Sequence, residues 1–195
     1  MKKTINSLVK QTYPYQKIII IFNSYENVDK IELFVNNIDS DVCFCFVNSF
    51  KEAEDEVEGK YLQFLYNGTI LLSNKILDEV VFLEKHPFIT IVLSKFYYGK
   101  FNFSQNKINE IGSGTVIEFP VLKKELQSAN IKKINGMFSS SLFRRNMFYS
   151  FYDLCNILDN GLSVYDFWNY VLSIDRFKEH GVLYAIDEIM VGGYI

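Results

Sequence analysis

The feature that most constrains this chain is a short run of isoleucines, Ile18-Ile19-Ile20-Ile21, followed by Phe22. All five side chains are apolar, so the run lacks the alternation of a strand that has one face in water. A short β-branched run of this kind is typical of a strand buried on both faces, as the strands of parallel sheets are. The run therefore favours an α/β domain.

The rest of the first half alternates between helical and strand patterns. Helices are expected at 4–12, 28–38, 49–58 and 74–84, and strands at 17–22, 42–47, 61–65 and 88–97. This alternation predicts an α/β fold with a mostly parallel central sheet. Parallel sheets bind ligands beyond the carboxyl ends of their strands, so we look for a site in the loops at 23–27 and 66–69.

The second half is less regular, and no break in composition marks a second domain. A strand is expected at 115–119, helices at 143–158 and 165–177, and one or two strands at 182–194. We therefore interpret residues 1–195 as a single domain.

Composition excludes several classes of protein. The net charge of −3 gives no broad basic field, so we expect no nucleic-acid partner. No apolar run reaches the roughly 20 residues of a membrane-spanning helix, so we expect no membrane span. The three cysteines show no metal-site spacing, which indicates reduced thiols and a cytoplasmic location.

Four segments, taken in order, resemble the family-2 glycosyltransferases. The first is Ile5–Pro14 followed by Lys17–Ile21, which is similar to the family's "S-L-x-x-Q-T-Y-P" stretch and the strand after it. The second is Glu58–Leu65, which is similar to "A-x-G-x-Y-I-x-F-L". The third and fourth are Leu142–Phe148, similar to "F-R-R-x-x-F", and Tyr165–Trp168, similar to "E-D-x-D-F-W". The resemblance implies a GT-A fold, a nucleotide-binding α/β sandwich. It also implies sugar transfer from a nucleotide-sugar to a glycan or protein acceptor, with 1–98 as the nucleotide-binding half and 99–195 as the acceptor-side half.

The chain departs from the family where the family holds its metal. The resemblance places the metal-binding Asp-x-Asp at Tyr66 and Gly68, neither of which is a carboxylate. Magnesium and manganese need oxygen ligands and prefer carboxylates, so we expect no metal cofactor. The tripeptide Asp39-Ser40-Asp41 has the right letters but lies between a helix and a strand, where a solvated loop is expected.

The candidate site residues follow from the resemblance and from the expected loops. Asn23 stands where the family has a nucleoside-binding aspartate, and Tyr66 and Asn67 follow the third strand, so these three are candidates for substrate binding. Arg144 and Arg145 either clamp a diphosphate, which guanidinium binds bidentately, or form a structural pair that faces acidic loops.

The catalytic base is also displaced. The family's "E-D" pair falls at Ser163 and Val164, and Val164 cannot accept a proton. Asp166 follows two residues later and is either the base or a residue that supports the start of its helix.

The family's first strand is missing from the front of this sequence. Either the sequence is a piece of a larger protein, or the sheet lacks that strand and has an edge to cover, as in a homodimer. Two functions remain open: an atypical or impaired glycosyltransferase, and a non-catalytic module that binds a glycan or assists a partner transferase.

Overall fold

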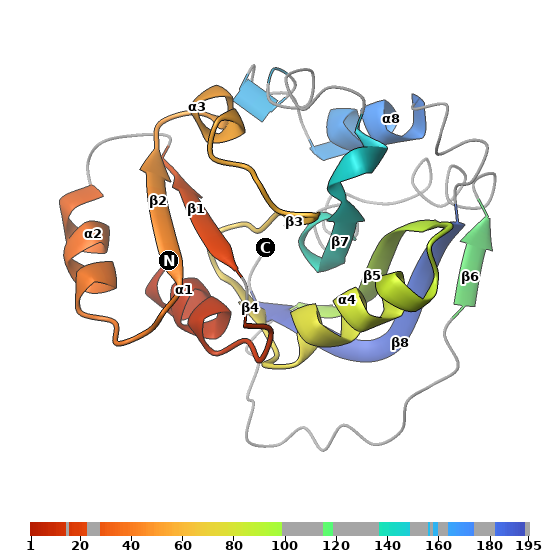
Figure 1. Ribbon diagram of the computed structural model, residues 1–195, viewed down its shortest axis with the longest axis horizontal. Helices are drawn as coiled ribbons and strands as arrows, with labels where there is room; N and C mark the ends of the chain where they lie inside the picture. Colours follow the sequence, from red (N-terminus) through yellow and green to blue (C-terminus); the bar gives the residue numbers. More distant parts are fainter. Residues whose placement is uncertain are drawn as a thin grey trace.

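The computed structural model describes residues 1–14, 16–22, 28–98, 115–118, 137–148, 156, 158–159, 164–173 and 182–193 (Figure 1). The helices are α1 (Lys2–Val9), α2 (Val28–Asn36), α3 (Phe50–Glu54), α4 (Lys75–Lys85), the 3-10 turn η2 (Arg145–Met147) and α8 (Val164–Ser173). The strands are β1 (Lys17–Ile21), β2 (Cys43–Val47), β3 (Tyr61–Gln63), β4 (Thr69–Leu71), β5 (Ile89–Tyr98), β6 (Thr115–Glu118), β7 (Ser141–Arg144) and β8 (Val182–Gly193). The element order confirms the α/β class.

The isoleucine run forms β1, which pairs in parallel with β2 from Lys17 opposite Cys43 to Ile21 opposite Val47. Ile18 and Ile20 are buried in a core that also contains Ile5 of α1. Ile31 and Val35 of α2 belong to the same core. The sequence prediction of two parallel strands is therefore confirmed for this small sheet.

The larger sheet differs from the prediction of a mostly parallel central sheet, which is wrong. Its strand order is β3-β7-β5-β8-β4, and β6 pairs with β8. Of its pairings, β5 with β8 is parallel, and the other four are antiparallel. The sheet takes strands from both 1–98 and 99–195, so the two predicted halves share one sheet.

Two short strands account for this difference. Residues 141–144 form β7 and lie between β3 and β5 in antiparallel register, whereas the sequence predicts a helix from residue 143 onward. The segment after β3 turns at Gly68 and forms β4, which the sequence pattern did not predict. Gly68 has a φ of 102°, a backbone conformation that glycine adopts without steric cost, so the glycine permits this reversal.

Helices cover both faces of the larger sheet. Ile91, Leu93 and Phe143 point to the face that packs against α8. Val92 and Leu142 point to the opposite face, where α4 packs. Successive residues of a strand point to opposite faces, so β5 and β7 supply side chains to both cores.

Helix α1 joins the two sheets, because its polar side chains bind the free backbone edge of β4. Thr4 Oγ1 accepts a hydrogen bond from the Gly68 N–H at 3.0 Å. Ser7 Oγ accepts one from the Leu71 N–H at 3.2 Å.

Gln11, which lies two residues beyond the end of α1, continues this polar stripe. Its Nε2 donates to the Leu72 carbonyl at 2.7 Å, and its Oε1 accepts from the Ile76 N–H at 3.1 Å. The glutamine is buried, so these backbone groups have little access to water. The contacts give a structural reason for a serine and a glutamine four residues apart in the motif Ser7–Pro14.

Replacing Gln11 with leucine tests this joint. The change leaves the Leu72 carbonyl and the Ile76 N–H without their side-chain partner, which costs about 2–3 kcal/mol of the free energy of unfolding. Urea denaturation measures the loss. The control is Lys10→Gln, an exposed change on the same turn that leaves the stability within about 0.5 kcal/mol of the wild type. Equal stability of the two variants would show that Gln11 does not hold the β4 edge.

Candidate functional site

The loop between β3 and β4 carries two of the candidate binding residues. Tyr66 is half-buried and Asn67 is exposed, and the turn is closed by a 3.1 Å hydrogen bond from the Thr69 N–H to the Tyr66 carbonyl. Helix α1 fixes the same turn through the bond from Gly68 to Thr4. The loop is thus a short, anchored turn that presents an amide and a phenol side by side in the chain.

An aromatic cluster connects this loop to α8. The Tyr66 ring lies 5.4 Å from the ring of Phe138, which in turn lies 4.9 Å from the ring of Phe167 in an edge-to-face arrangement. Phe64 stacks on Phe138 at 5.3 Å. Burial raises the pKa of the Tyr66 phenol above its ordinary value of 10, so the hydroxyl stays neutral and can donate a hydrogen bond.

Asp166 lies on α8 next to the buried Phe167, so the cluster brings the helix that carries it to the Tyr66 loop. The carboxylate is half-buried and belongs to the first turn of the helix. Negative charge is favoured at a helix N-terminus, so this position suits a structural acid as well as a base.

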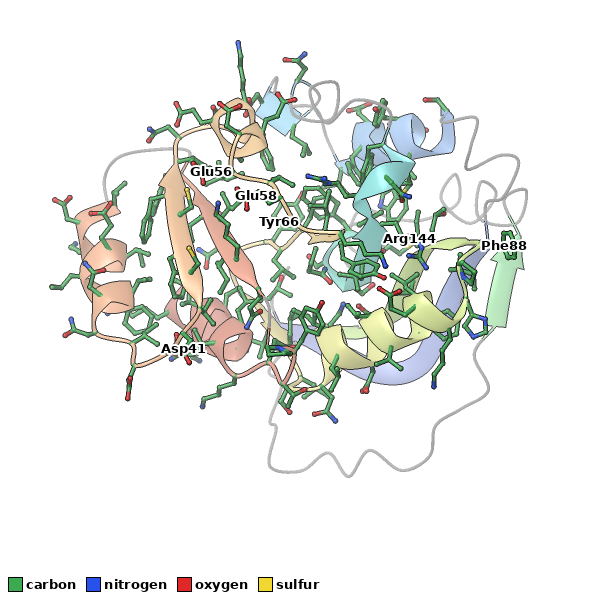
Figure 2. All side chains as sticks on the ribbon, in the orientation of Figure 1. Asp41, Glu56, Glu58, Tyr66, Phe88 and Arg144 are labelled. Carbon is green, nitrogen blue, oxygen red and sulfur yellow. The ribbon has the colours of Figure 1, made fainter. Side chains whose placement is uncertain are left out.

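Arg144 occupies a different place, at the C-terminal end of α4 (Figure 2). Its side chain is 8% exposed, and its guanidinium donates to the Leu83, His86 and Ile89 carbonyls. The guanidinium also lies 5.6 Å from the centre of the Tyr61 ring and donates to its hydroxyl. These contacts satisfy carbonyls that a helix end leaves unpaired, which is the structural alternative for this arginine.

Arg145 is exposed and fastens the segment before β3. Its Nη1 donates to the Val57 carbonyl at 2.7 Å, and its backbone N–H donates to the Lys60 carbonyl at 2.9 Å. Neither arginine contacts the Tyr66 loop through a hydrogen bond that the structure describes. Asn23 lies outside the described residues.

The acidic side chains of the described part of the chain form no candidate metal centre. Among these residues, no three His, Cys, Asp or Glu side chains gather as metal ligands. Asp41 is exposed in the turn before β2, and Glu56 pairs with Lys17 at 2.6 Å (Figure 2). None of the described helices is long and apolar enough to cross a membrane.

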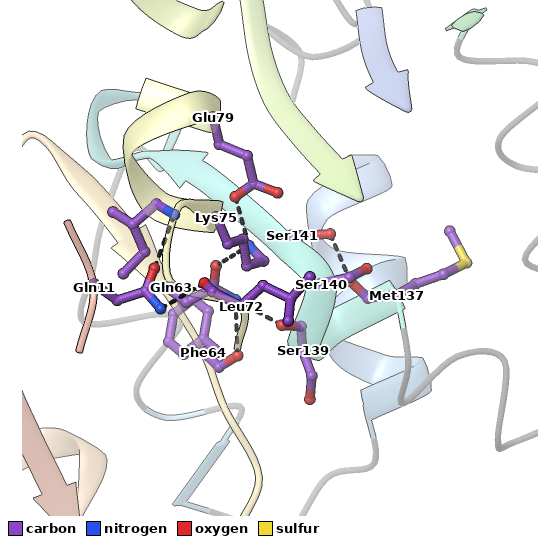
Figure 3. Close-up of polar contacts among 11 residues, drawn as sticks. Gln11, Gln63, Phe64, Leu72, Lys75, Glu79, Met137, Ser139, Ser140 and Ser141 are labelled. Carbon is purple, nitrogen blue, oxygen red and sulfur yellow. Dashed lines mark hydrogen bonds and ion pairs between the residues drawn. The ribbon is translucent and has the colours of Figure 1, made fainter. Parts of the chain in front are cut away.

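Sequence reasoning missed a buried polar network beneath the loop (Figure 3). Lys75 and Glu79 of α4 are fully buried, and their Nζ and Oε2 atoms lie 2.5 Å apart. Lys75 Nζ also donates to Gln63 Oε1 of β3 at 2.7 Å. A lysine and a glutamate four residues apart were visible in the sequence, but such pairs usually lie on an exposed helix face.

Comparison with known proteins gives the class of fold. The sequence matches no model of a protein family and no curated protein. The structure is similar to that of the S. aureus glycosyltransferase TarS. For TarS 1-349 in complex with UDP, the TM-score is 0.55, with 15% sequence identity over 99% of this chain and 56% of that chain.

Two further TarS structures agree with this one. TarS itself gives a TM-score of 0.57 at 14% identity, covering 99% of this chain and 34% of that chain. TarS 1-349 gives 0.59 at 13% identity, covering 98% and 56%. This chain therefore spans about a third to a half of the length of the TarS chains, and it has a glycosyltransferase-like α/β fold.

The role of Arg144 can be tested by substitution. Arg144→Met leaves the carbonyls at the end of α4 without their buried donor and lowers the free energy of unfolding by about 2–4 kcal/mol. Arg144→Lys recovers only part of the loss, because an ammonium lacks the planar fork of the guanidinium. The matched control is Arg145→Met, which removes one exposed hydrogen bond to the Val57 carbonyl and therefore lowers the free energy of unfolding by less than about 1 kcal/mol in urea denaturation. A full recovery by lysine would contradict the capping role.

Proposed function

We propose that this protein is a glycosyltransferase-like protein that binds a nucleotide-sugar at the loop between β3 and β4. The similarity to TarS over 98–99% of the chain is the observation that carries the proposal, since one of those structures holds UDP. The resemblance of the sequence to family-2 glycosyltransferases, which have the GT-A fold, independently supports the same class.

The described contacts narrow the list of binding residues. Tyr66 and Asn67 remain the best candidates, because the loop is anchored and carries a neutral phenol and an exposed amide. Hydroxyls and amides hydrogen-bond to sugar and nucleoside hydroxyls. The donors of Arg144 already bind backbone carbonyls, so we leave it out of the binding site. Arg145 has one described side-chain contact and stays a candidate for phosphate.

Asp166 is the proposed base. A direct displacement needs a group that accepts the proton of the attacking acceptor hydroxyl. The aromatic cluster holds the helix that carries Asp166 against the loop that carries Tyr66. The sequence lacks the family's metal-binding carboxylates at 66 and 68, so the proposed chemistry is atypical and uses no metal held there.

UDP binding tests the proposed donor site. A hundredfold excess of UDP over its Kd raises the free energy of unfolding by about 2.7 kcal/mol, which a thermal shift detects as an increase in Tm. Asn67→Ala weakens this effect, whereas Asn36→Ala, an exposed change on α2, leaves it as in the wild type. ADP and CDP serve as competing nucleotides, each with and without manganese. If none of these nucleotides raises the Tm, the proposed donor site is excluded.

The proposed base makes a separate prediction about turnover. Asp166→Asn keeps UDP binding but reduces UDP release from a panel of UDP-sugars by about a hundredfold or more. The matched control is Asn169→Ala, an exposed change on the same helix that preserves the rate. A wild type that binds UDP but releases none from any sugar would instead support the non-catalytic partner. Unchanged turnover in Asp166→Asn would remove Asp166 from the mechanism.

A further inference from the structure

The interior of this protein holds a charged pair that its candidate site does not use. Lys75 and Glu79 have no exposed side-chain surface, although each carries an ionisable group. Buried ions are costly unless they are paired and hydrogen-bonded, so a pair in such a position calls for a reason. The contacts around the pair indicate that reason.

The pair is connected to the candidate loop through Gln63 (Figure 3). Gln63 Oε1 accepts from Lys75 Nζ at 2.7 Å, which orients the other end of its amide. Its Nε2 then donates to the Phe64 carbonyl at 3.2 Å and to the Ser139 carbonyl at 2.9 Å. One glutamine therefore joins α4, the end of β3 and the short helical segment 137–140.

Both backbone groups that Gln63 holds belong to segments that contact Tyr66 or lead to it. Phe64 lies just after β3 and precedes Tyr66 by two residues, and Ser139 follows Phe138, whose ring packs 5.4 Å from that of Tyr66. The rings of Phe64 and Phe138 also stack on each other at 5.3 Å. A change in the orientation of the Gln63 amide therefore acts on two neighbours of the loop.

We propose that Glu79, Lys75 and Gln63 form a proton-sensitive link that sets the position of the loop carrying Tyr66 and Asn67. The structural part of this proposal, that the three side chains connect α4 to the loop, rests on the hydrogen bonds given above. As a control on nucleotide binding it rests on the function proposed above.

The link responds to the charge on Glu79. When the carboxylate is ionised, it holds the Lys75 ammonium, which then donates to Gln63. When a proton from solvent binds Glu79, the buried ammonium keeps its own proton but loses its counter-charge, and the Lys75 side chain moves. Gln63 Oε1 then loses its charged donor, and its amide is no longer held toward Ser139.

The surroundings place this change near neutral pH. Burial raises the pKa of Glu79 from 4.5 to about 7, and Lys75 opposes the rise by favouring the charged carboxylate. Asp78 on the same helix raises the pKa further by repulsion, and Ser94 of β5 lies close enough to lower it, although its hydroxyl makes no regular hydrogen bond. Burial also lowers the pKa of Lys75, so burial disfavours the charged form of both Lys75 and Glu79.

Side-chain NMR tests the link on the intact chain. The amide signals of Gln63 and the ring signals of Tyr66 shift together between about pH 5.5 and about 8.5, with a midpoint of about 7. Glu79→Gln keeps the shape of the side chain and abolishes both titrations. Asp78→Asn removes an exposed carboxylate from the same helix and keeps them. Constant Gln63 signals in the wild type, or an unchanged titration in Glu79→Gln, would overturn the proposal.

A second measurement covers the case in which Glu79→Gln fails to fold. The double variant Lys75→Met with Glu79→Leu removes both charges together, which proteins often tolerate, and it must also lose the titrations. The folded pKa of Glu79 lies above its unfolded value, so the folded state binds more protons between about pH 4.5 and about 7. The Tm of the wild type therefore falls relative to that of the double variant as pH rises through this range. A constant difference in Tm would overturn the proposal.

Nucleotide binding separates the two levels of the proposal. If the link controls the donor site, UDP binds the wild type about fivefold more tightly above pH 7 than below it, and the double variant shows no such dependence. A wild type whose Gln63 titrates but which binds no UDP at any pH retains the link and refutes the donor site. UDP binding with no pH dependence refutes the control while leaving the donor site intact.

Discussion

The hydrogen bonds from α1 and from Gln11 beyond its end to the backbone of β4 and of the residues next to it hold the two sheets of this structure together. Thr4, Ser7 and Gln11 bind donors and acceptors that no neighbouring strand described here reaches. The opposite side of the same helix puts Ile5 into the core of the small parallel sheet. One short helix thus completes the edge of one sheet and covers the face of another, so the position of the candidate loop depends on it.

The segments that resemble family-2 glycosyltransferases build the fold. Gln11 binds the β4 edge, Arg144 caps α4, and Phe167 fills the aromatic core under Tyr66. Each of these residues therefore has a structural role in this chain, whose fold is similar to that of TarS at 13–15% sequence identity.

The sequence predicted the small parallel sheet well, because a run of four isoleucines leaves little alternative to a strand buried on both faces. It failed for β7, because the strand has only two apolar residues, Leu142 and Phe143, and so short a segment has no period that distinguishes a strand from a helix. It also failed for the Lys75–Glu79 pair, because residue spacing gives no measure of burial. The candidate loop was found from the end of β3, whereas its anchoring depends on contacts between residues about 64 positions apart.

The joint between α1 and β4 has a consequence for how this protein tolerates variation. Thr4, Ser7 and Gln11 recognise main-chain atoms, which every amino acid except proline offers alike. The strand is thus free to exchange its half-buried Ile70 for other apolar residues without loosening the helix, whereas Thr4 and Ser7 of the helix and Gln11 beyond its end have no such freedom. We therefore expect related sequences to keep polar residues at positions 4, 7 and 11 even where the residues of β4 differ.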